Sequence, residues 1–372
     1  MNKKIGFRPT WAEINLGNLA YNFRQIRKAV SPVTKIMVTV KADAYGHGLI
    51  PVSNKLVECG VDFLGVASID EGILLRKGGI KLPILVMGVV LEEHVGELFN
   101  FRLTPTICDI DQAKALHKKA RSLKQDINIH IKVDTGMGRI GVSHYDAAGL
   151  VGKIANLKSL KIEGLFTHFA FADMNKKFTH YQAFLFYHLV SKLNRSGIRI
   201  PLIHAANSAG LLDYGSTHFN MCRPGLAIYG LYPRGNLKNS LKPVLSLKTK
   251  VIFVKRVPQG TGISYGHAYV TNRDTNIVTL PIGYGDGYQR NLSNISPVLI
   301  KGRRFKISGR ICMDQMMVDV GDLPVKVGDE VVLIGFQGRN EISAQELAEL
   351  SATIPYEIVC GLGSRIPRIY IG

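Results

Sequence analysis

The sequence has few features of secreted or membrane-inserted proteins. It contains five cysteines, an odd number, at positions far apart (Cys59, Cys108, Cys222, Cys312 and Cys360). No C-x-x-C pair or His-x-x-His cluster accompanies them, so we expect neither a disulfide framework nor a metal site. The basic start lacks the apolar core of a signal peptide, and the longest apolar run, ILVMGVVL from residue 84, is too short to span a bilayer. We therefore expect a cytoplasmic protein with reduced thiols and no membrane partner.

Acidic residues are also scarce. The chain has 28 acidic and 47 basic residues, a formal net charge of +19, and one dense basic run, KGRRFK, at 301–306. Such a balance can indicate nucleic-acid binding. Because the basic residues are spread along the chain and are not grouped with aromatic residues on one element, we interpret them as a solvated surface and predict no nucleic-acid partner.

Strand-like and helix-like segments alternate through the first two thirds of the chain. Eight β-rich segments begin at residues 35 (KIMVTVK), 62 (DFLGVAS), 84 (ILVMGVV), 104 (TPTICD), 127 (INIHIKVD), 162 (IEGLFTHF), 202 (LIHAANS) and 222 (CRPGLAIYG). Apolar residues recur at helical spacing between most of them, for example over 17–30, 111–123 and 180–197. Eight strand-helix units are the number in a closed parallel barrel. We predict an α/β fold with a TIM-type (β/α)₈ barrel over residues 14–240.

The pattern changes after Pro243. Segments with alternating apolar and polar positions follow one another, separated by glycine turns. We predict a second, mostly-β domain over residues 241–372, with residues 1–13 packing on it. One helix is expected there, over 343–350, because Ser343 and Glu346 have the spacing of a capping box.

Polar residues and glycines recur where the barrel strands are predicted to end. They are Lys41, Arg139, His168, Asn207, Ser208, Arg223 and Gly225. Barrel enzymes carry their active site at this end, and a phosphate commonly binds the loops after strands seven and eight. Each residue alone is more often structural, so the evidence is their convergence on one face. Ser208 with the amides near Gly225 and Leu226 suits a phosphate, and a lysine at the same mouth suggests pyridoxal phosphate, whose aldehyde forms a Schiff base with a lysine amine.

A glycine-rich string offers a different interpretation. DTGMGRIG places glycines at 136, 138 and 141, the G-x-G-x-x-G spacing of a dinucleotide-binding loop in a nicotinamide oxidoreductase. We disfavour this alternative because the string follows the fifth strand and not the first, and because the bulky Arg139 occupies the loop.

Six motifs together resemble the alanine racemase family over essentially the whole chain. They are VKADAYGHG, KVDTGMGRIG, HAANSAG, RPGLAIYG, GISYGHAY and GRICMDQ. The resemblance implies a homodimeric, pyridoxal-phosphate-dependent isomerase that interconverts L- and D-alanine and supplies D-alanine for peptidoglycan. It also implies two catalytic bases, Lys41 and Tyr265, since one base on one face of the substrate would tend to return the starting enantiomer.

The resemblance also implies roles for other residues. We expect cofactor contacts from Lys41, Tyr45, Arg139, His168, Asn207, Ser208, Arg223, Gly225, Leu226 and Tyr356, and substrate contacts from Arg139 and Met313. Within this set, Arg223 would face the pyridine nitrogen, while Arg139 would face the phenolate oxygen. Tyr265 and Met313, with Cys312 and Asp314, would complete the site of the partner subunit. His168 and Arg223 would tune Tyr265, and Lys132 aligns with a lysine that is carbamylated in some relatives.

Two further alternatives share much of this site. A broader amino-acid racemase acting on serine would use the same residues. A non-catalytic pyridoxal-phosphate carrier of the same barrel type would usually lack the β domain that carries Tyr265.

Overall fold

The computed structural model describes residues 7–232 and 241–372. The chain divides into two compact units. We call the first, residues 20–44 and 49–228, the barrel unit, and the second, the described parts of 1–19, 45–48 and 229–372, the β unit. The predicted domain boundary at residue 240 lies outside the described residues. No helix in the described ranges is long and apolar enough to cross a membrane.

The barrel unit contains a closed sheet of eight parallel strands, as predicted. The strands are β2 (Lys35–Thr39), β3 (Phe63–Val66), β4 (Ile84–Val86), β5 (Thr104–Ile107), β6 (Ile127–Asp134), β8 (Leu160–Phe166), β9 (Leu202–His204) and β10 (Met221–Cys222). Each pairs with the next in this order, and β10 pairs with β2 to close the ring. A short strand, β7 (Val142–Ser143), adds to β6. Most strand residues are buried, because a parallel barrel is covered on both faces.

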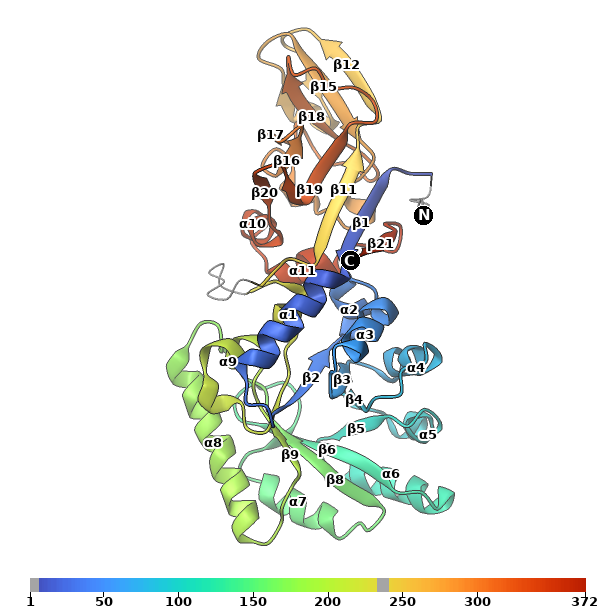
Figure 1. Ribbon diagram of the computed structural model, residues 1–372, viewed down its shortest axis with the longest axis vertical. Coiled ribbons are helices and arrows are strands. Elements are labelled where there is room, and N and C mark those ends of the chain that lie inside the picture. Colours follow the sequence, from blue (N-terminus) through green and yellow to red (C-terminus); the bar gives the residue numbers. More distant parts are fainter. Residues whose placement is uncertain (1–6, 233–240) are drawn as a thin grey trace. The chain divides into compact units, whose positions relative to one another are not determined.

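Helices connect the strands and surround them (Figure 1). They are α1 (Leu16–Ala29), α2 (Lys41–Gly46), α3 (Leu49–Glu58), α4 (Ile69–Lys77), α5 (Val95–Asn100), α6 (Ile110–Leu123), α7 (Ala147–Ala155), α8 (Lys176–Arg195) and α9 (Ser208–Asp213). The three helices expected from periodicity appear as α1, α6 and α8. Helix α8 begins four residues earlier than predicted because Asn175 caps it by accepting a hydrogen bond from the Phe178 amide.

The barrel core is built by residues from different strands. Met37, Phe63, Leu85, Phe166 and Met221 form one buried cluster. Because β2, β3, β4, β8 and β10 each contribute one member, the cluster ties the ring together across its interior. Truncating such a residue to alanine typically costs 2–5 kcal/mol, so this cluster fixes the frame that carries the strand-end loops.

The β unit is built around sheets whose strands are antiparallel except for the parallel pair β1 and β21. Its strands are β1 (Thr10–Asn15), β11 (Leu245–Lys250), β12 (Phe253–Val257), β13 (Gly262–Ile263), β14 (Tyr269–Val270), β15 (Thr275–Leu280), β16 (Pro297–Ile300), β17 (Arg303–Lys306), β18 (Met316–Gly321), β19 (Glu330–Gln337), β20 (Asn340–Ile342) and β21 (Arg368–Ile371). Strand β1 lies between β11 and β21, so the start of the described chain is part of this sheet.

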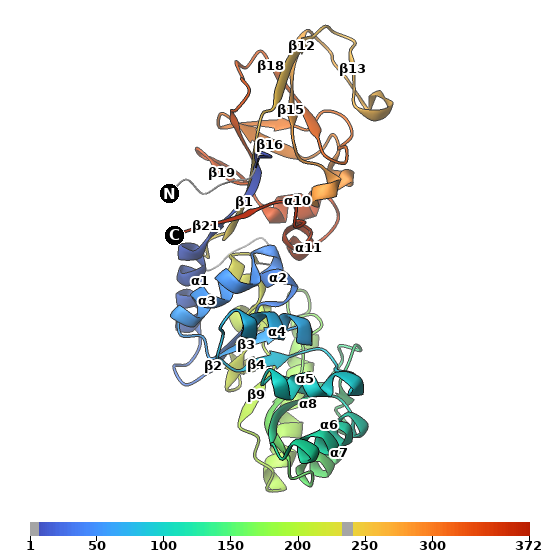
Figure 2. The ribbon, with the colours of Figure 1, turned by 90° about the vertical axis from the view of Figure 1, so that its right-hand side faces the viewer.

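Two local features of the β unit bear on function. Half of the predicted capping box is present: Ser343 accepts a hydrogen bond from the Glu346 amide at the start of α10 (Ala344–Leu350), whereas the Glu346 carboxylate binds Arg304. Helix α11 (Pro355–Cys360) follows. Strands β13 and β14 pair in a small two-stranded sheet, and Figure 2 shows β13 and the turn after it at the edge of the unit. Tyr265 lies in that turn.

Candidate functional site

The barrel unit gathers cationic residues at the ends of its strands. Lys41 directly follows Val40, the residue after β2, and the amide of Thr39 donates to the carbonyl of Pro224, 3.0 Å away, which joins this segment to the one after β10. Burial, and after it the charge of Arg223, lowers the pKa of the His168 imidazole, and the charges of Arg139 and Lys41 also contribute. The structure therefore brings these four predicted residues together.

Lys41 begins α2, and the backbone of this short segment is left-handed, which the sequence did not reveal. Residues 42 to 45 all have φ between +52° and +54°, although none is glycine. Left-handed backbone costs about 1–2 kcal/mol per non-glycine residue, so the surroundings must hold it. Glu71 does so in the barrel unit: its carboxylate accepts the Ala42 amide at 2.6 Å and the Ala67 amide at 2.7 Å. Asp43 also accepts the Leu49 amide at 2.7 Å.

This turn determines the direction in which Lys41 leaves the strand. Residues with strained, left-handed backbone cluster at active sites and ligand-binding segments. The glycines Gly46 and Gly48 were the only local signal of an unusual turn. Glu71 itself gave none, because an acidic residue in the first turn of α4 fits ordinary helix chemistry.

The loops after β9 and β10 form a cradle suited to a phosphate. Ser208, at the start of α9, accepts hydrogen bonds from the amides of Gly225 (3.0 Å) and Ala227 (3.1 Å) through its hydroxyl oxygen. That hydroxyl still has its own hydrogen to donate. The buried amide of Leu226, the first residue of η3 (Leu226–Tyr229), has no acceptor among the described residues. Asn207 caps α9 by accepting the Gly210 amide, which makes its side chain a structural support for the cradle.

Arg223 is the most strongly held of the predicted residues. It is 4% exposed, and its Nη2 donates to the carbonyls of Thr167 (2.6 Å) and Ala205 (3.0 Å). Its Nη1 donates to His204 Nδ1 at 2.9 Å, and Nη2 lies 3.4 Å from His168 Nδ1. Burial lowers the pKa of Arg223 to about 10, so the guanidinium remains cationic at neutral pH. It is a fixed positive donor that cannot give up its proton in this range.

Lys132 is a buried amine in the same region. It is 4% exposed, and its Nζ lies 5.4 Å from the centroid of the Phe166 ring. Burial first, and then the charges of Arg139 and Arg223, lower the pKa of Lys132 from 10.5 to about 8. Asp134, two residues along β6, does not pair with it: its carboxylate accepts the amides of residues 136, 137 and 138 at 2.8 to 2.9 Å.

The same Asp134 contacts exclude the dinucleotide interpretation of DTGMGRIG. The amides that would bind a pyrophosphate already donate to the Asp134 carboxylate. The loop also leads from β6 to the short strand β7, whereas a dinucleotide fingerprint opens a helix. The glycines instead supply positive φ values of +126°, +70° and +124° to a tight turn.

Two buried histidines that contact the candidate site were not identified from the sequence. His130 on β6 and His204 on β9 are fully buried, and His130 Nδ1 lies 2.8 Å from His204 Nε2. Burial lowers the pKa of both imidazoles, so both are neutral at pH 7. Their positions in INIHIKVD and LIHAANS were the available signal, since a histidine in an otherwise apolar strand needs a partner.

The remaining predicted residues belong to the β unit. Tyr45 is buried, and its ring centroid lies 5.6 Å from that of Tyr356 on α11 and 4.9 Å from that of Tyr229. Tyr265 is 68% exposed and Met313 is 53% exposed. Both side chains therefore lie at the surface of the β unit.

The loops that carry Tyr265 and Met313 touch each other. Ser264, with φ of +66°, donates its hydroxyl to the Arg310 carbonyl at 2.6 Å and lies 3.7 Å from Cys312 Sγ. The backbone at Met313 is held in turn, because its carbonyl accepts the Gly285 amide at 2.9 Å. The β unit therefore presents Tyr265 and Met313 on adjoining, constrained loops.

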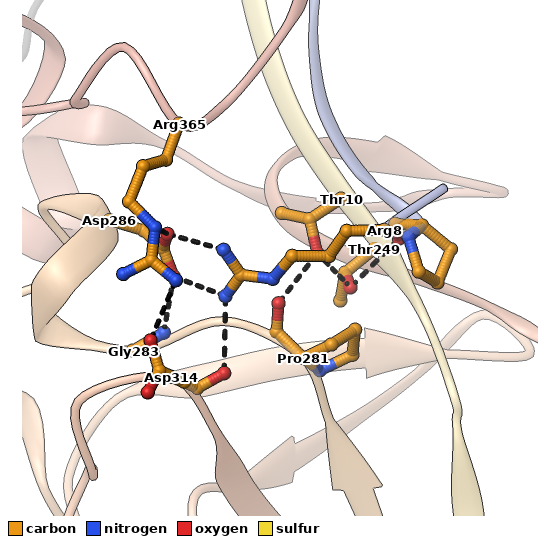
Figure 3. A network of polar contacts seen from close by, with 9 residues as sticks. Arg8, Thr10, Thr249, Pro281, Gly283, Asp286, Asp314 and Arg365 are labelled. Atoms are coloured by element: carbon orange, nitrogen blue, oxygen red, sulfur yellow. Dashed lines mark hydrogen bonds and ion pairs between the residues drawn. The ribbon is translucent and has the colours of Figure 1, made fainter. Parts of the chain in front are cut away.

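An ion-pair network fixes the end of the loop that carries Met313 (Figure 3). Arg8 donates two hydrogen bonds to the fully buried carboxylate of Asp286, at 2.6 and 2.5 Å, and a third to the carbonyl of Asp314 at 3.1 Å. Arg365 binds the Asp314 carboxylate at 2.7 Å. A residue near the start of the chain thus anchors the ICMDQ loop, a link of 306 positions that local sequence patterns cannot reveal.

Comparisons with known proteins cover the whole chain. The family model described as "Alanine racemase, N-terminal domain" matches residues 14–233, and that described as "Alanine racemase, C-terminal domain" matches residues 244–370. An alanine racemase from Halothermothrix orenii is 50% identical over 100% of this chain and 98% of its own length. An alanine racemase from Symbiobacterium thermophilum is 45% identical over 99% of this chain and 98% of its own length.

Solved structures of alanine racemases also match this chain over nearly its whole length. The alanine racemase of Clostridium difficile 630 is 40% identical, with a TM-score of 0.94 over 98% of this chain and 96% of that one. The alanine racemase of Bacillus anthracis with bound L-Ala-P is 36% identical, with a TM-score of 0.93, and the match covers 99% of this chain and 96% of that one. Identity of this level, sustained across the barrel unit and the β unit alike, means that the chain belongs to the alanine racemase family.

Proposed function

We propose that the protein racemises alanine with pyridoxal phosphate as its cofactor. The observation that carries the proposal is the set of groups at the strand ends of the barrel unit: an amine at Lys41, a fixed guanidinium at Arg223, and a neutral phosphate cradle at Ser208 and Leu226. The relatives that share this chain's full length are named alanine racemases. The D-alanine formed would be a precursor of peptidoglycan, and the site of action would be the cytoplasm.

The residues present fit the cofactor. The Ser208 hydroxyl and the Leu226 amide can donate to a phosphate without adding charge. Tyr45 and Tyr356 are proposed as further phosphate ligands, with Asn207 and Gly225 shaping the loop. Lys41 would hold the aldehyde covalently. Bound pyridoxal phosphate would withdraw electrons from the substrate and so acidify the proton on Cα.

Arg223 would face the pyridine nitrogen and limit the reaction to racemisation. Because its guanidinium keeps its protons at neutral pH, it would donate a hydrogen bond to the ring nitrogen without protonating it. In this way Arg223 would disfavour side reactions such as transamination. Arg139 would bind the phenolate oxygen and the substrate carboxylate.

Two bases on opposite faces would exchange the Cα proton. Lys41 would serve one face through its amine. Tyr265 would serve the other from the partner subunit of a homodimer, with His168 and Arg223 tuning it and with the Met313 amide binding the substrate carboxylate. The exposure of Tyr265 and Met313 on adjoining loops supports this arrangement, since a partner would cover both.

The test is conversion of L-alanine to D-alanine by the protein loaded with pyridoxal phosphate, with serine and lysine as comparison substrates. We expect alanine to be turned over best, and we expect Lys41→Ala and Tyr265→Phe to lose activity by at least about a thousandfold. Tyr145→Phe, which alters another strongly exposed tyrosine, is the matched control and should retain the full rate. A normal rate in Lys41→Ala would refute the assignment.

A further inference from the structure

We propose that Glu163 is a positioning residue for Arg223, acting through His130 and His204. The inference rests on the proposed function in one respect only: the role of Arg223 at the pyridine nitrogen. The four side chains form a continuous chain of polar contacts through the interior of the barrel unit.

The contacts run from the active end of the barrel toward the surface. Arg223 Nη1 lies 2.9 Å from His204 Nδ1, and His204 Nε2 lies 2.8 Å from His130 Nδ1. His130 Nε2 then lies 3.3 Å from Glu163 Oε2. The two histidines are fully buried, whereas the Glu163 side chain is 21% exposed. A carboxylate at the edge of the barrel is thus connected to a guanidinium at the strand ends.

Hydrogen-bond chemistry gives this relay one direction. Arginine can only donate, so His204 Nδ1 must accept and His204 must carry its hydrogen on Nε2. That hydrogen points to His130 Nδ1, which must therefore accept. His130 then carries its hydrogen on Nε2 and donates it to the Glu163 carboxylate, which can only accept. Every hydrogen in the relay points from Arg223 toward Glu163.

The neutral state of both histidines agrees with this direction. A doubly protonated imidazole could not accept from Arg223 or from the other histidine. Burial lowers the pKa of both, and the charge of Arg223 lowers both further, while Glu163 opposes the shift at His130. Each imidazole therefore has one donor and one acceptor nitrogen, as the relay requires.

The packing around the relay leaves the rings little freedom. A Cβ added at Gly164 would lie 2.4 Å from His130 Nδ1, so the absence of a side chain there makes room for the imidazole. The His204 ring stacks on Phe166, with centroids 4.8 Å apart and planes 3° from parallel. Neither ring can flip without displacing a neighbour, so the identity of the terminal group determines the tautomers.

Loss of the carboxylate permits the opposite direction. A water or an amide that donated to His130 Nε2 would move the His130 hydrogen to Nδ1. That hydrogen would point at His204 Nε2 and move the second hydrogen to His204 Nδ1, where it would face the N–H of Arg223. Two donors would oppose each other, and Arg223 would turn away from His204. Glu163 prevents this outcome by remaining an acceptor.

The first experiment measures tautomers in the cofactor-free protein by ¹⁵N NMR of labelled histidine. We expect His130 and His204 to be neutral and to carry hydrogen on Nε2. In Glu163→Ala, and in the more conservative Glu163→Gln, we expect the ring-nitrogen signals of both to change. Asn128→Ala is the matched control: Asn128 Nδ2 donates to Glu163 Oε1 at 2.8 Å, so this variant removes a neighbour of Glu163 while keeping the relay. Hydrogen on His204 Nδ1 in the unaltered protein would overturn the proposal.

The second experiment measures kinetics of the loaded enzyme. A carboxylate that directly fixes a catalytic imidazole contributes about 10⁴-fold to kcat. Glu163 acts through two imidazoles, so we expect Glu163→Ala to lower kcat by about tenfold and to change KM by less than about twofold. The band position of the bound cofactor should shift in Glu163→Ala and not in Asn128→Ala.

The two failures are distinguishable. No racemisation by the unaltered enzyme would refute the proposed function, whereas the NMR result would still decide the relay. Unchanged kcat and an unchanged cofactor band in Glu163→Gln, together with altered histidine signals, would show that the relay exists but does not position Arg223, and would end this proposal.

Discussion

Replacing Lys132 by methionine should stabilise the protein, because the buried ammonium is held at an energetic cost. The pKa of Lys132 falls from 10.5 to about 8 on folding, which corresponds to about 3 kcal/mol at 1.4 kcal/mol per pKa unit. Contact of the ammonium with the Phe166 ring, 5.4 Å to the centroid, returns about 1 kcal/mol. Methionine has a similar length and no charge, so Lys132→Met should raise the free energy of unfolding by about 2 kcal/mol at pH 7.

The pH dependence identifies the cause. Below pH 8 the amine is protonated in the folded and unfolded states alike, and the whole penalty is present. Between pH 8 and 10.5 the unfolded state binds more protons than the folded state, so wild-type stability rises with pH and the advantage of methionine shrinks. By pH 9.5 the difference should have fallen below roughly 1 kcal/mol.

Urea unfolding of the cofactor-free proteins, followed by far-UV circular dichroism at both pH values, measures the difference. Lys124→Met, at the C-terminal end of α6, is the exposed control and should change stability by less than about 0.5 kcal/mol. Equal gains at pH 7 and 9.5 would refute the argument from charge. Destabilisation at pH 7 would mean that the amine carries a partner group. ¹³C NMR after exposure to labelled bicarbonate would then show whether that group is a carbamate.

Three further substitutions probe the supports of the site. Glu71→Gln should weaken the hydrogen bonds that hold the left-handed turn, lowering stability by about 1–3 kcal/mol and reducing the fraction of protein that binds pyridoxal phosphate, read from absorbance. Arg8→Ala should lower the stability of the protein by about 3–5 kcal/mol in thermal unfolding, because Asp286 is fully buried. Ser208→Ala should weaken cofactor binding about tenfold in equilibrium titration, while stability changes by only about 1 kcal/mol.

Each of these has an outcome that contradicts it. Full cofactor occupancy in Glu71→Gln would mean that the turn holds itself. An unchanged melting temperature in Arg8→Ala would mean that Arg365, whose Nε lies 3.5 Å from Asp286 Oδ1, suffices for the carboxylate. Normal cofactor affinity in Ser208→Ala would remove the hydroxyl from the phosphate cradle.

Most of the fold could be predicted because its signals are local. The eight barrel strands are short apolar segments buried on both faces, and the helices have apolar stripes, in one case with a recognisable cap at Ser343. The strand-end rule then placed Lys41, His168 and Arg223 at one rim without knowledge of any contact.

The missed features depend on contacts between distant residues. Nothing in KADAY favours a left-handed turn, because alanine is the best former of right-handed helix and Glu71 lies 29 positions from the amide it accepts. His130 and His204 are 74 positions apart, and each alone has the pattern of a core residue. Sequence patterns give the frame, whereas strained backbone and polar networks appear only when the frame brings their parts together.

The residues gathered at the strand ends of the barrel unit carry an excess of positive charge. The charged groups that lower the pKa of His168 are Arg223, Lys132, Arg139 and Lys41, and all four are cations. Their mutual repulsion is unfavourable, and a bound anion would relieve it. A phosphate, a phenolate and a substrate carboxylate would each do so. After burial, the charges of Arg139, Arg223 and Lys41 also lower the pKa of the Lys132 amine. The same group of cations that favours the binding of anions therefore favours the neutral form of the Lys132 amine.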